Sequence, residues 1–216
     1  MNAAIDKLVS GFKTFHERFF EENKELYQRL VTEGQSPKAL VIACADSRVD
    51  PAIMLQADPG DIFSIRNVAN VVPPYQEGGD VSYHGTSTAI EFAINGLGIK
   101  NIVVCGHAHC AGVKAMVSGQ EGSPVGGQFV PQWTSIINKG YELAKQKNPG
   151  AEGAELDRCC ERQSVLVSLE NLMTFPFVKE KVDAGELEIH GWYLDIAQGE
   201  LSRYNPNTDK FEMVAL

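Results

Sequence analysis

The sequence predicts an α/β protein with a mainly parallel central sheet flanked by helices, an N-terminal helical arm and a C-terminal antiparallel edge hairpin. Two patterns support this fold. Short apolar runs of strand length alternate with segments of helical period, as they do in parallel sheets. Near the C-terminus, a run at 187–196, a turn at Gln198-Gly199 and a run at 201–204 indicate a hairpin. We expect one domain over residues 1–216, because this length is sufficient to bury a core.

The chain begins with an amphipathic segment. Residues 5–31 have the apolar period of a helix, and several phenylalanines share one face. That face is too apolar for solvent, so we expect residues 1–33 to form an arm that packs on another surface. Our prediction is a partner subunit, and packing on the chain's own domain is the open alternative. Gly34 and Pro37 end the helix.

A strand at 39–43 follows, and Pro51 fits the first turn of a short helix capped by Ser47 or Asp50. The other elements are predicted from periodicity and from Gly and Pro breaks. In order, they are a turn at 58–61, a strand at 62–66, a loop at 67–80, a helix at 83–97, a strand at 101–105, a helix from 111 to 117, a loop at 119–127, and helices at 133–147 and 152–173.

Composition excludes several classes of function. The net charge of −9 argues against a nucleic-acid surface, which needs clustered Lys and Arg. No apolar run approaches the roughly 20 residues that a membrane helix needs. The first 20 residues are amphipathic and do not resemble a signal peptide. Five cysteines without an export signal suggest reduced thiols and a cytoplasmic protein, although a chain from which a transit peptide had been removed would look the same.

Potential metal ligands follow two of the predicted strands. The first strand leads into Cys44, with Asp46 and Arg48 at alternate positions after it. The strand at 101–105 leads into His107 and Cys110, which lie about one turn apart. The carboxyl ends of strands in open α/β sheets bind ligands, and thiolates with imidazole suit zinc. A lone cysteine after a strand is more often a small core residue, but the joint pattern predicts that Cys44, His107 and Cys110 bind one Zn²⁺.

The sequence Cys44-Ala45-Asp46-Ser47-Arg48, followed by Gly106-His107-x-x-Cys110, resembles the β-class carbonic anhydrases. The similarity extends to residues 35–38, 66–70 and 187–204, and Ala111 stands where many members carry glycine. The resemblance implies a carbonate dehydratase, in which a zinc-bound hydroxide attacks carbon dioxide to give bicarbonate and a proton. It also implies self-association into dimers or multiples of dimers.

The resemblance further implies roles for individual residues. Asp46 and Arg48 match the family's catalytic dyad, in which the arginine holds the carboxylate off the metal and the carboxylate orients the hydroxide. Gln35 matches a position whose amide donates a hydrogen bond to the substrate. Phe63, Val68 and Phe92 match the walls of the substrate pocket, to which two subunits contribute. Without the resemblance, these would be read as a loop residue and as plain core residues.

Some members of the family are regulated by bicarbonate and carry Trp where this chain has Val41. Together with Gln35, this resembles the plant-type, open-site subgroup, in which the resting zinc carries water and not Asp46. Two alternatives use the same fold: a carbon disulfide or carbonyl sulfide hydrolase, and a non-catalytic zinc protein. The second would be marked by loss of Asp46 or Arg48, and both are present.

Other Cys and His residues are expected to lie outside the site. Cys105 should be a buried thiol on the opposite side of its strand from the ligands. His109 should face away from the zinc. Cys159 and Cys160 are adjacent on a predicted helix, so they cannot easily pair with each other or share the metal.

Overall fold

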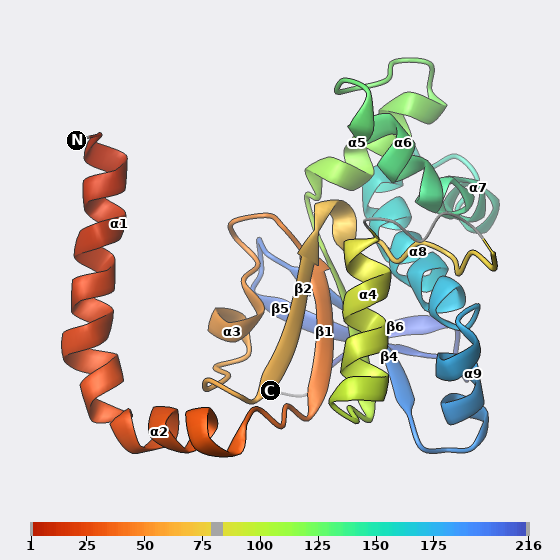
Figure 1. Ribbon diagram of the computed structural model, residues 1–216. Coiled ribbons are helices and arrows are strands. Elements are labelled where there is room, and N and C mark those ends of the chain that lie inside the picture. Colours follow the sequence, from red (N-terminus) through yellow and green to blue (C-terminus); the bar gives the residue numbers. More distant parts are fainter. Residues whose placement is uncertain (1, 79–83, 215–216) are drawn as a thin grey trace. The chain divides into compact units, whose positions relative to one another are not determined.

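The computed structural model describes residues 2–78 and 84–214, and the chain divides into two compact units, Met1–Ser36 and Pro37–Leu216 (Figure 1). The predicted loop at 67–80 and helix at 83–97 therefore each extend into residues outside the described part. The α/β fold predicted from the sequence is confirmed in the larger unit.

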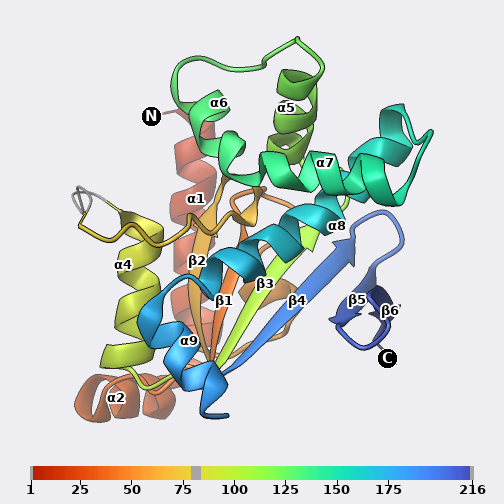
Figure 2. The ribbon, with the colours of Figure 1, turned by 90° about the vertical axis from the view of Figure 1, so that its right-hand side faces the viewer.

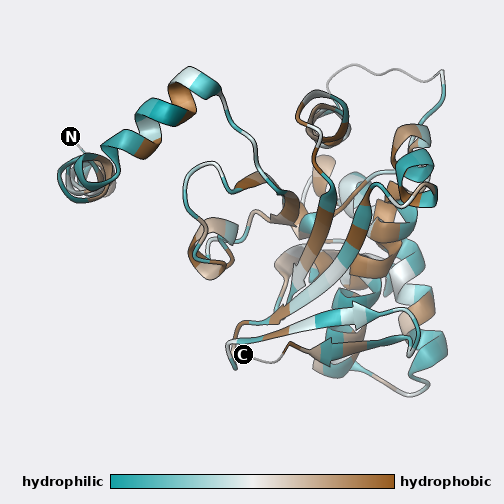
Figure 3. Cartoon of the chain, turned by 90° about the horizontal axis from the view of Figure 1, so that it is seen from below, coloured by the Kyte–Doolittle hydropathy of each residue, from teal (hydrophilic) through white to brown (hydrophobic). Residues whose placement is uncertain are grey.

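The smaller unit is helical but is not one continuous helix. Its elements are α1 (Ala3–Thr14), a π-helical turn (Phe15–Phe20) and α2 (Lys24–Glu33). The Asn2 side chain caps α1 by accepting a hydrogen bond from the Ala4 amide. The chain breaks at Asn23, whose side-chain amide donates to the Phe19 carbonyl at 2.8 Å. Hydrophobic and hydrophilic residues both occur along these helices, and none of the residues in them is buried (Figure 3).

The larger unit contains a six-stranded sheet in the order β2-β1-β3-β4-β5-β6. The strands are β1 (Ala39–Cys44), β2 (Ile62–Asn67), β3 (Asn101–His107), β4 (Glu188–Asp195), β5 (Glu200–Asn205) and β6 (Lys210–Met213). Strands β1 to β4 run parallel to one another, whereas β5 is antiparallel to β4 and β6 is antiparallel to β5. The predicted edge hairpin is present, and β6 extends it by a strand that the sequence pattern did not reveal.

The helices of this unit are α3 (Pro51–Met54), α4 (Gly85–Glu91), α5 (Ala111–Gln120), α6 (Phe129–Thr134), α7 (Asn138–Lys147), α8 (Gly153–Leu172) and α9 (Pro176–Asp183). In the described part of the helix predicted at 83–97, α4 is followed by a π-helical turn at Phe92–Gly96. Two other elements differ from the predicted ones. The helix predicted at 133–147 begins at Phe129 and is interrupted by a 3₁₀ turn at Ser135–Ile137. Helix α9 follows the predicted helix at 152–173 and was not predicted, because a proline also fits the end of a helix; here Pro176 occupies the first turn of a new helix.

Alternate residues of β1 and β3 face opposite sides of the sheet. On one side, Leu40, Ile42 and Val104 pack with residues of α4, α8 and α9. On the other side, Val41 and Cys105 belong to a smaller cluster that includes residues around α3. Helix α8 runs along the first side (Figure 2), and the inner strands carry mainly hydrophobic residues (Figure 3).

Helices α5, α6 and α7 gather beyond the carboxyl ends of the parallel strands (Figure 2). Their apolar residues form a further core cluster with Cys44 and Cys110. The segments that follow β1 and β3 therefore lie beside packed helices, at the edge of the sheet where ligands bind in open α/β folds. Within the described residues, no helix combines the length and the apolar character needed to span a bilayer.

Candidate metal centre

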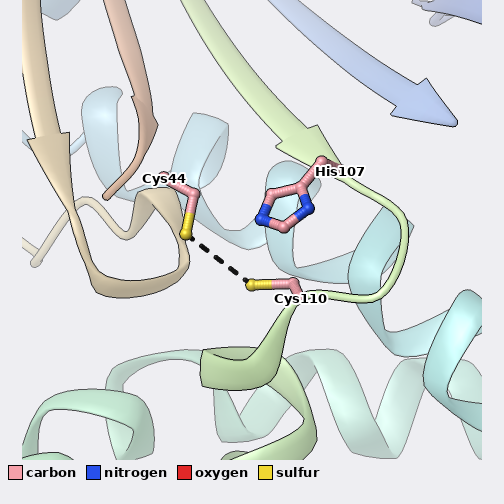
Figure 4. Close-up of side chains that lie close together, drawn as sticks. All are labelled: Cys44, His107 and Cys110. Atoms are coloured by element: carbon pink, nitrogen blue, oxygen red, sulfur yellow. Dashed lines mark hydrogen bonds between the residues drawn. The ribbon is translucent and has the colours of Figure 1, made fainter. Parts of the chain in front are cut away.

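The side chains of Cys44, His107 and Cys110 converge from three element ends, as Figure 4 shows. Cys44 is the last residue of β1, His107 is the last residue of β3, and Cys110 immediately precedes α5. Their ligand atoms all lie within 4.8 Å of one another, and the two sulfurs are 3.9 Å apart. All three residues are buried. The structure thus brings together the three residues that the sequence predicted as metal ligands.

The hydrogen bonding of His107 fits a metal ligand. Its Nδ1 lies 2.8 Å from the carbonyl oxygen of Ala108, which assigns the ring proton to Nδ1. Its Nε2 is buried and lacks a hydrogen-bond partner among the described residues. A buried lone pair beside two sulfurs is expensive unless it is satisfied. One imidazole and two thiolates form a donor set that suits Zn²⁺, so the residues present fit this ion.

The two sulfurs affect each other's ionisation. The hydrogen bond from Cys110 lowers the pKa of Cys44 to about 4. The same contact, together with burial, raises the pKa of Cys110. A divalent cation that binds both sulfurs would displace a proton shared between them.

Asp46 and Arg48 form a fork-like ion pair beside the ligands. The Nε and Nη2 atoms of Arg48 donate to the two carboxylate oxygens of Asp46 at 2.9 and 2.7 Å, and the Arg48 amide donates to one of them at 2.9 Å. These hydrogen bonds hold the pKa of the Asp46 carboxyl well below its usual range. Arg48 Nη2 also donates to the carbonyl oxygen of His109 at 3.1 Å. Both oxygens of Asp46 are therefore bound to Arg48, and Asp46 is not part of the ligand cluster.

Arg66 fixes the backbone of the turn that carries these residues. Its Nε donates to the carbonyl oxygen of Cys44 at 3.1 Å, and its Nη2 donates to that of Asp46 at 2.6 Å. Its Nη1 pairs with Asp50 at 2.8 Å. The Asp50 carboxylate also accepts from the amides of the first turn of α3, so Asp50, and not Ser47, is the cap.

Glu161 lies in the middle of α8 and is 1% exposed. Its Oε1 accepts hydrogen bonds from the Cys110 amide at 3.0 Å and from Arg158 Nη2 at 2.6 Å. Its Oε2 accepts from the Tyr193 hydroxyl at 2.7 Å. Burial raises the pKa of Glu161, and the hydrogen bond from Tyr193 and the charge of Arg158 oppose this effect. A buried carboxylate thus lies directly behind one of the two sulfur ligands.

Two glycines allow the helices to approach the site closely. A Cβ at Gly106 would lie 2.5 Å from a methyl group of Val165 on α8. A Cβ at Gly112 would lie 2.7 Å from Val68 and 2.9 Å from Ala69. Both distances are shorter than ordinary van der Waals contacts, so Gly106 sets how closely α8 packs on β3, and Gly112 sets how closely α5 packs on the segment after β2.

The family model described as carbonic anhydrase matches residues 39–201. The chain belongs to the carbonic anhydrase family. A carbonic anhydrase of Synechocystis is 34% identical over 204 residues, which cover 93% of this chain and 71% of that protein. Beta carbonic anhydrase 3 of Arabidopsis thaliana is 36% identical over 91% of this chain and 75% of its own length.

Two solved structures similar to this chain are β-carbonic anhydrases. The β-carbonic anhydrase CcaA superposes with a TM-score of 0.87 and 32% identity, over 98% of this chain and 100% of that chain. A structure from a study of two tetrameric β-carbonic anhydrases of Sordaria macrospora gives a TM-score of 0.80 and 27% identity, over 94% and 97%. The chain is thus a member of the β class of carbonic anhydrases.

The four residues predicted to bind substrate do not form one cluster within the chain, unlike the three metal ligands. Val68 lines a cavity of about 810 Å³ together with Trp133, whose indole N–H donates to the Val68 carbonyl at 2.7 Å. Phe63 and Phe92 pack together, with ring centroids 5.9 Å apart. In the sheet, Phe63 is paired with Leu40, which lies four residues before Cys44. Within one chain, the rings of Phe63 and Phe92 therefore lie away from the metal ligands. Gln35 belongs to the smaller unit.

The remaining cysteines and His109 lie as expected. Cys105 is buried in the cluster on the α3 side of the sheet, and Cys159 and Cys160 lie side by side on α8. His109 is exposed, with φ of 59°. No role was predicted from the sequence for Arg66 or Glu161. Arg66 lies in a segment similar to carbonic anhydrases, which was a usable signal, whereas nothing in the local sequence distinguishes Glu161 from a surface residue of a helix.

Proposed function

We propose that this protein is a zinc-dependent carbonic anhydrase that catalyses the reversible hydration of carbon dioxide to bicarbonate and a proton. The observation that carries the proposal is the convergence of Cys44, His107 and Cys110 beside an Asp46 carboxylate that Arg48 holds. Membership of the β class supports the same reaction.

Cys44, His107 and Cys110 would hold the zinc ion. Three protein ligands would leave one position of a tetrahedral ion for water, and zinc would lower the pKa of that water far below the pKa of free water, so that it could act as a nucleophile. The burial of the three side chains excludes bulk water from the ligand set, which strengthens electrostatic interactions at the site.

Asp46 supplies a fixed hydrogen-bond acceptor. Its depressed pKa keeps it ionised, so its oxygens can only accept hydrogen bonds. Arg48 donates to both oxygens, and the remaining lone pairs can accept a hydrogen bond from the O–H of the reacting water and so orient it. The absence of Asp46 from the described ligand cluster supports the open-site state, in which this carboxylate does not bind the metal.

Carbon dioxide is apolar, so its pocket should be apolar and dry. We assign Val68, beside the cavity that it shares with Trp133, to this pocket. Gln35, Phe63 and Phe92 are proposed to contribute to the pocket in the assembled oligomer, because within one chain Phe63 and Phe92 pack away from the ligands. Phe92 is half exposed, which leaves its ring available to a second subunit.

The arm at residues 1–33 is proposed to pack on a partner subunit. Four apolar residues on one face of α1 support this, because they are between 48% and 69% exposed: Ile5, Leu8, Val9 and Phe12. The tetrameric relatives of Sordaria macrospora also support self-association. Sedimentation analysis tests the arm. Phe12→Glu should dissociate the oligomer, whereas Ser10→Glu, on the opposite side of α1, should leave it intact, and an unchanged mass for Phe12→Glu would refute the proposal.

The thiol ligands point to a reducing compartment such as the cytosol. Cys44 and Cys110 are free, and their sulfurs are 3.9 Å apart. Oxidation of this pair would remove both sulfur ligands, and disulfides form readily in oxidising compartments. Fractionation of the source cells with an antibody against the protein tests this proposal, and recovery from an oxidising compartment would contradict it.

Stopped-flow hydration of carbon dioxide, with metal analysis of the same sample, tests the reaction. The wild-type protein should hold one zinc per chain and hydrate carbon dioxide rapidly. Cys44→Ser should lose most of the zinc and the activity. Cys105→Ser is the matched control, because this cysteine is equally buried but lies on the α3 side of the sheet, and it should keep both. A zinc-loaded protein that does not hydrate carbon dioxide would overturn the proposal.

A further inference from the structure

The peptide group that joins His109 to Cys110 is held from two sides. Its carbonyl oxygen accepts a hydrogen bond from Arg48 at 3.1 Å, and its N–H donates to Glu161 Oε1 at 3.0 Å. The donor, Arg48, also holds the Asp46 carboxylate, and the acceptor, Glu161, lies on α8. A single peptide plane therefore connects the Asp46–Arg48 pair to a buried carboxylate.

This peptide plane needs external support. His109 is not a glycine, yet its φ is 59°, in the left-handed region. Such conformations persist when the surrounding structure determines them, and they cluster at functional sites. The orientation of this plane sets the direction in which the Cys110 side chain leaves the backbone, and it also places the oxygen that Arg48 binds.

Glu161 is well suited to hold the plane. Its carboxylate makes charge-assisted hydrogen bonds, which are stronger than neutral ones. Arg158 and the Tyr193 hydroxyl fix the carboxylate from two further directions, and Tyr193 is itself buried under the Arg162 guanidinium, which lies 4.4 Å from the ring centre. The close approach of α8 at Gly106 brings Glu161 within reach of the Cys110 amide.

We propose that Glu161 is a positioning residue, which acts through the His109–Cys110 peptide on both the metal ligand Cys110 and the dyad residue Arg48. The inference rests on the proposed function in one respect, because the metal is taken to be the zinc of a carbonic anhydrase. Groups that orient metal ligands from outside typically change metal affinity by about 10- to 100-fold when they are altered.

The decisive variant is Glu161→Gln, which keeps the shape of the side chain and removes its charge. We expect its zinc affinity, measured by competition with a chromophoric chelator, to fall about 10-fold. With Co²⁺ in place of zinc, the sulfur-to-cobalt charge-transfer band should shift, because the direction of the Cys110 sulfur changes. The kcat should fall with little change in KM, since the His109 carbonyl oxygen that Arg48 binds is held less firmly.

Glu170→Gln is the matched control, because Glu170 lies on the same helix and pairs with Lys139 at the surface. It should leave the affinity and the cobalt spectrum unchanged. A folded Glu161→Gln protein with wild-type zinc affinity and cobalt spectrum would overturn the proposal. These two readouts do not depend on turnover, so they test Glu161 even if the wild-type protein fails to hydrate carbon dioxide.

A second variant keeps the test decisive if Glu161→Gln does not fold. Tyr193→Phe removes one donor to the same carboxylate and leaves the bond to the Cys110 amide in place. It should reduce zinc affinity in the same direction by a few-fold and shift the cobalt band less. Wild-type values for both quantities would again overturn the proposal.

Discussion

The guanidinium of Arg66 donates a hydrogen bond to the backbone carbonyl of Asp46 at 2.6 Å. The same side chain also binds the Cys44 carbonyl and the Asp50 carboxylate. One residue of β2 therefore fixes the turn that carries both a metal ligand and the dyad carboxylate. The contacts are made to backbone atoms and to a helix cap, so they act on the position of the turn and not on its chemistry.

Replacing Arg66 with Gln should therefore weaken catalysis without removing any group that reacts. We expect kcat/KM to fall on the order of 100-fold, because small displacements of catalytic groups have effects of this size. The free energy of unfolding should fall by about 1–3 kcal/mol, since two carbonyl groups lose hydrogen bonds from a charged donor. Arg203→Gln, an exposed arginine on β5, is the control for stopped-flow hydration and urea unfolding. An Arg66→Gln enzyme with wild-type kcat/KM would contradict this role.

Replacing Arg48 with Ala should make the stability of the protein depend less on pH in the acidic range. Arg48 depresses the pKa of Asp46 in the folded protein, so the ion pair stabilises the fold above the unfolded pKa of Asp, about 3.9. That contribution is lost as the pH falls towards the folded pKa. The difference in Tm between wild type and Arg48→Ala should thus be constant above about pH 5 and shrink below about pH 4. Lys179→Ala, which removes an exposed pair with Asp183, should change Tm little at any pH. A difference that grows in acid would contradict the assignment.

The rate of hydration should rise from neutral to alkaline pH. Two thiolates and a neutral imidazole give a formally neutral zinc centre. Carbonic anhydrases with three histidine ligands have a bound-water pKa of about 7, and donation from two thiolates should weaken the Lewis acidity and raise that value. Stopped-flow rates between about pH 6.5 and 9 test this expectation. A rate that is already flat from acidic pH upward would exclude it.

Substitution of Gly112 by Ala should disturb the site through packing alone. The added methyl group would approach Val68 to 2.7 Å and Ala69 to 2.9 Å. Such overpacking typically destabilises a protein by about 1–3 kcal/mol. Gly119→Ala lies on the same helix with nothing within 4 Å of its Cβ, and it should be neutral or stabilising by up to about 1 kcal/mol. Thermal unfolding of both variants measures the contrast, and equal Tm values would show that α5 can shift away from Val68.

The metal ligands could be predicted from the sequence because their positions follow directly from the topology of the sheet. Cys44 and His107 end parallel strands, and such ends meet at one edge of a sheet. The Asp46–Arg48 pair is local, so its spacing was also informative. Arg66 and Glu161 act through backbone groups of distant segments, and no local pattern reports a hydrogen bond between α8 and the Cys110 amide.

The errors in the predicted elements have similar causes. Pro176 is compatible with either a helix end or a helix start, and the capping position Phe175 carries no side-chain cap to distinguish them. Strand β6 is short and contains Lys210 and Glu212, so its pairing with β5 depends on a tertiary neighbour and not on its own periodicity. The positive φ of His109 arises in the same way, because the contacts that maintain it come from other elements.

Cys44 and Cys110 are 66 residues apart in the chain, and a metal ion bound by both closes a loop of that length. A cross-link over such a loop removes chain entropy from the unfolded state worth on the order of 4 kcal/mol. Cys44 ends β1 and Cys110 follows the neighbouring strand β3, so we expect zinc to leave only when these strands separate. Zinc release to a fluorescent chelator and loss of tryptophan fluorescence should therefore share one rate constant during unfolding, and zinc release that precedes the loss of structure would show that the metal leaves from an intact sheet.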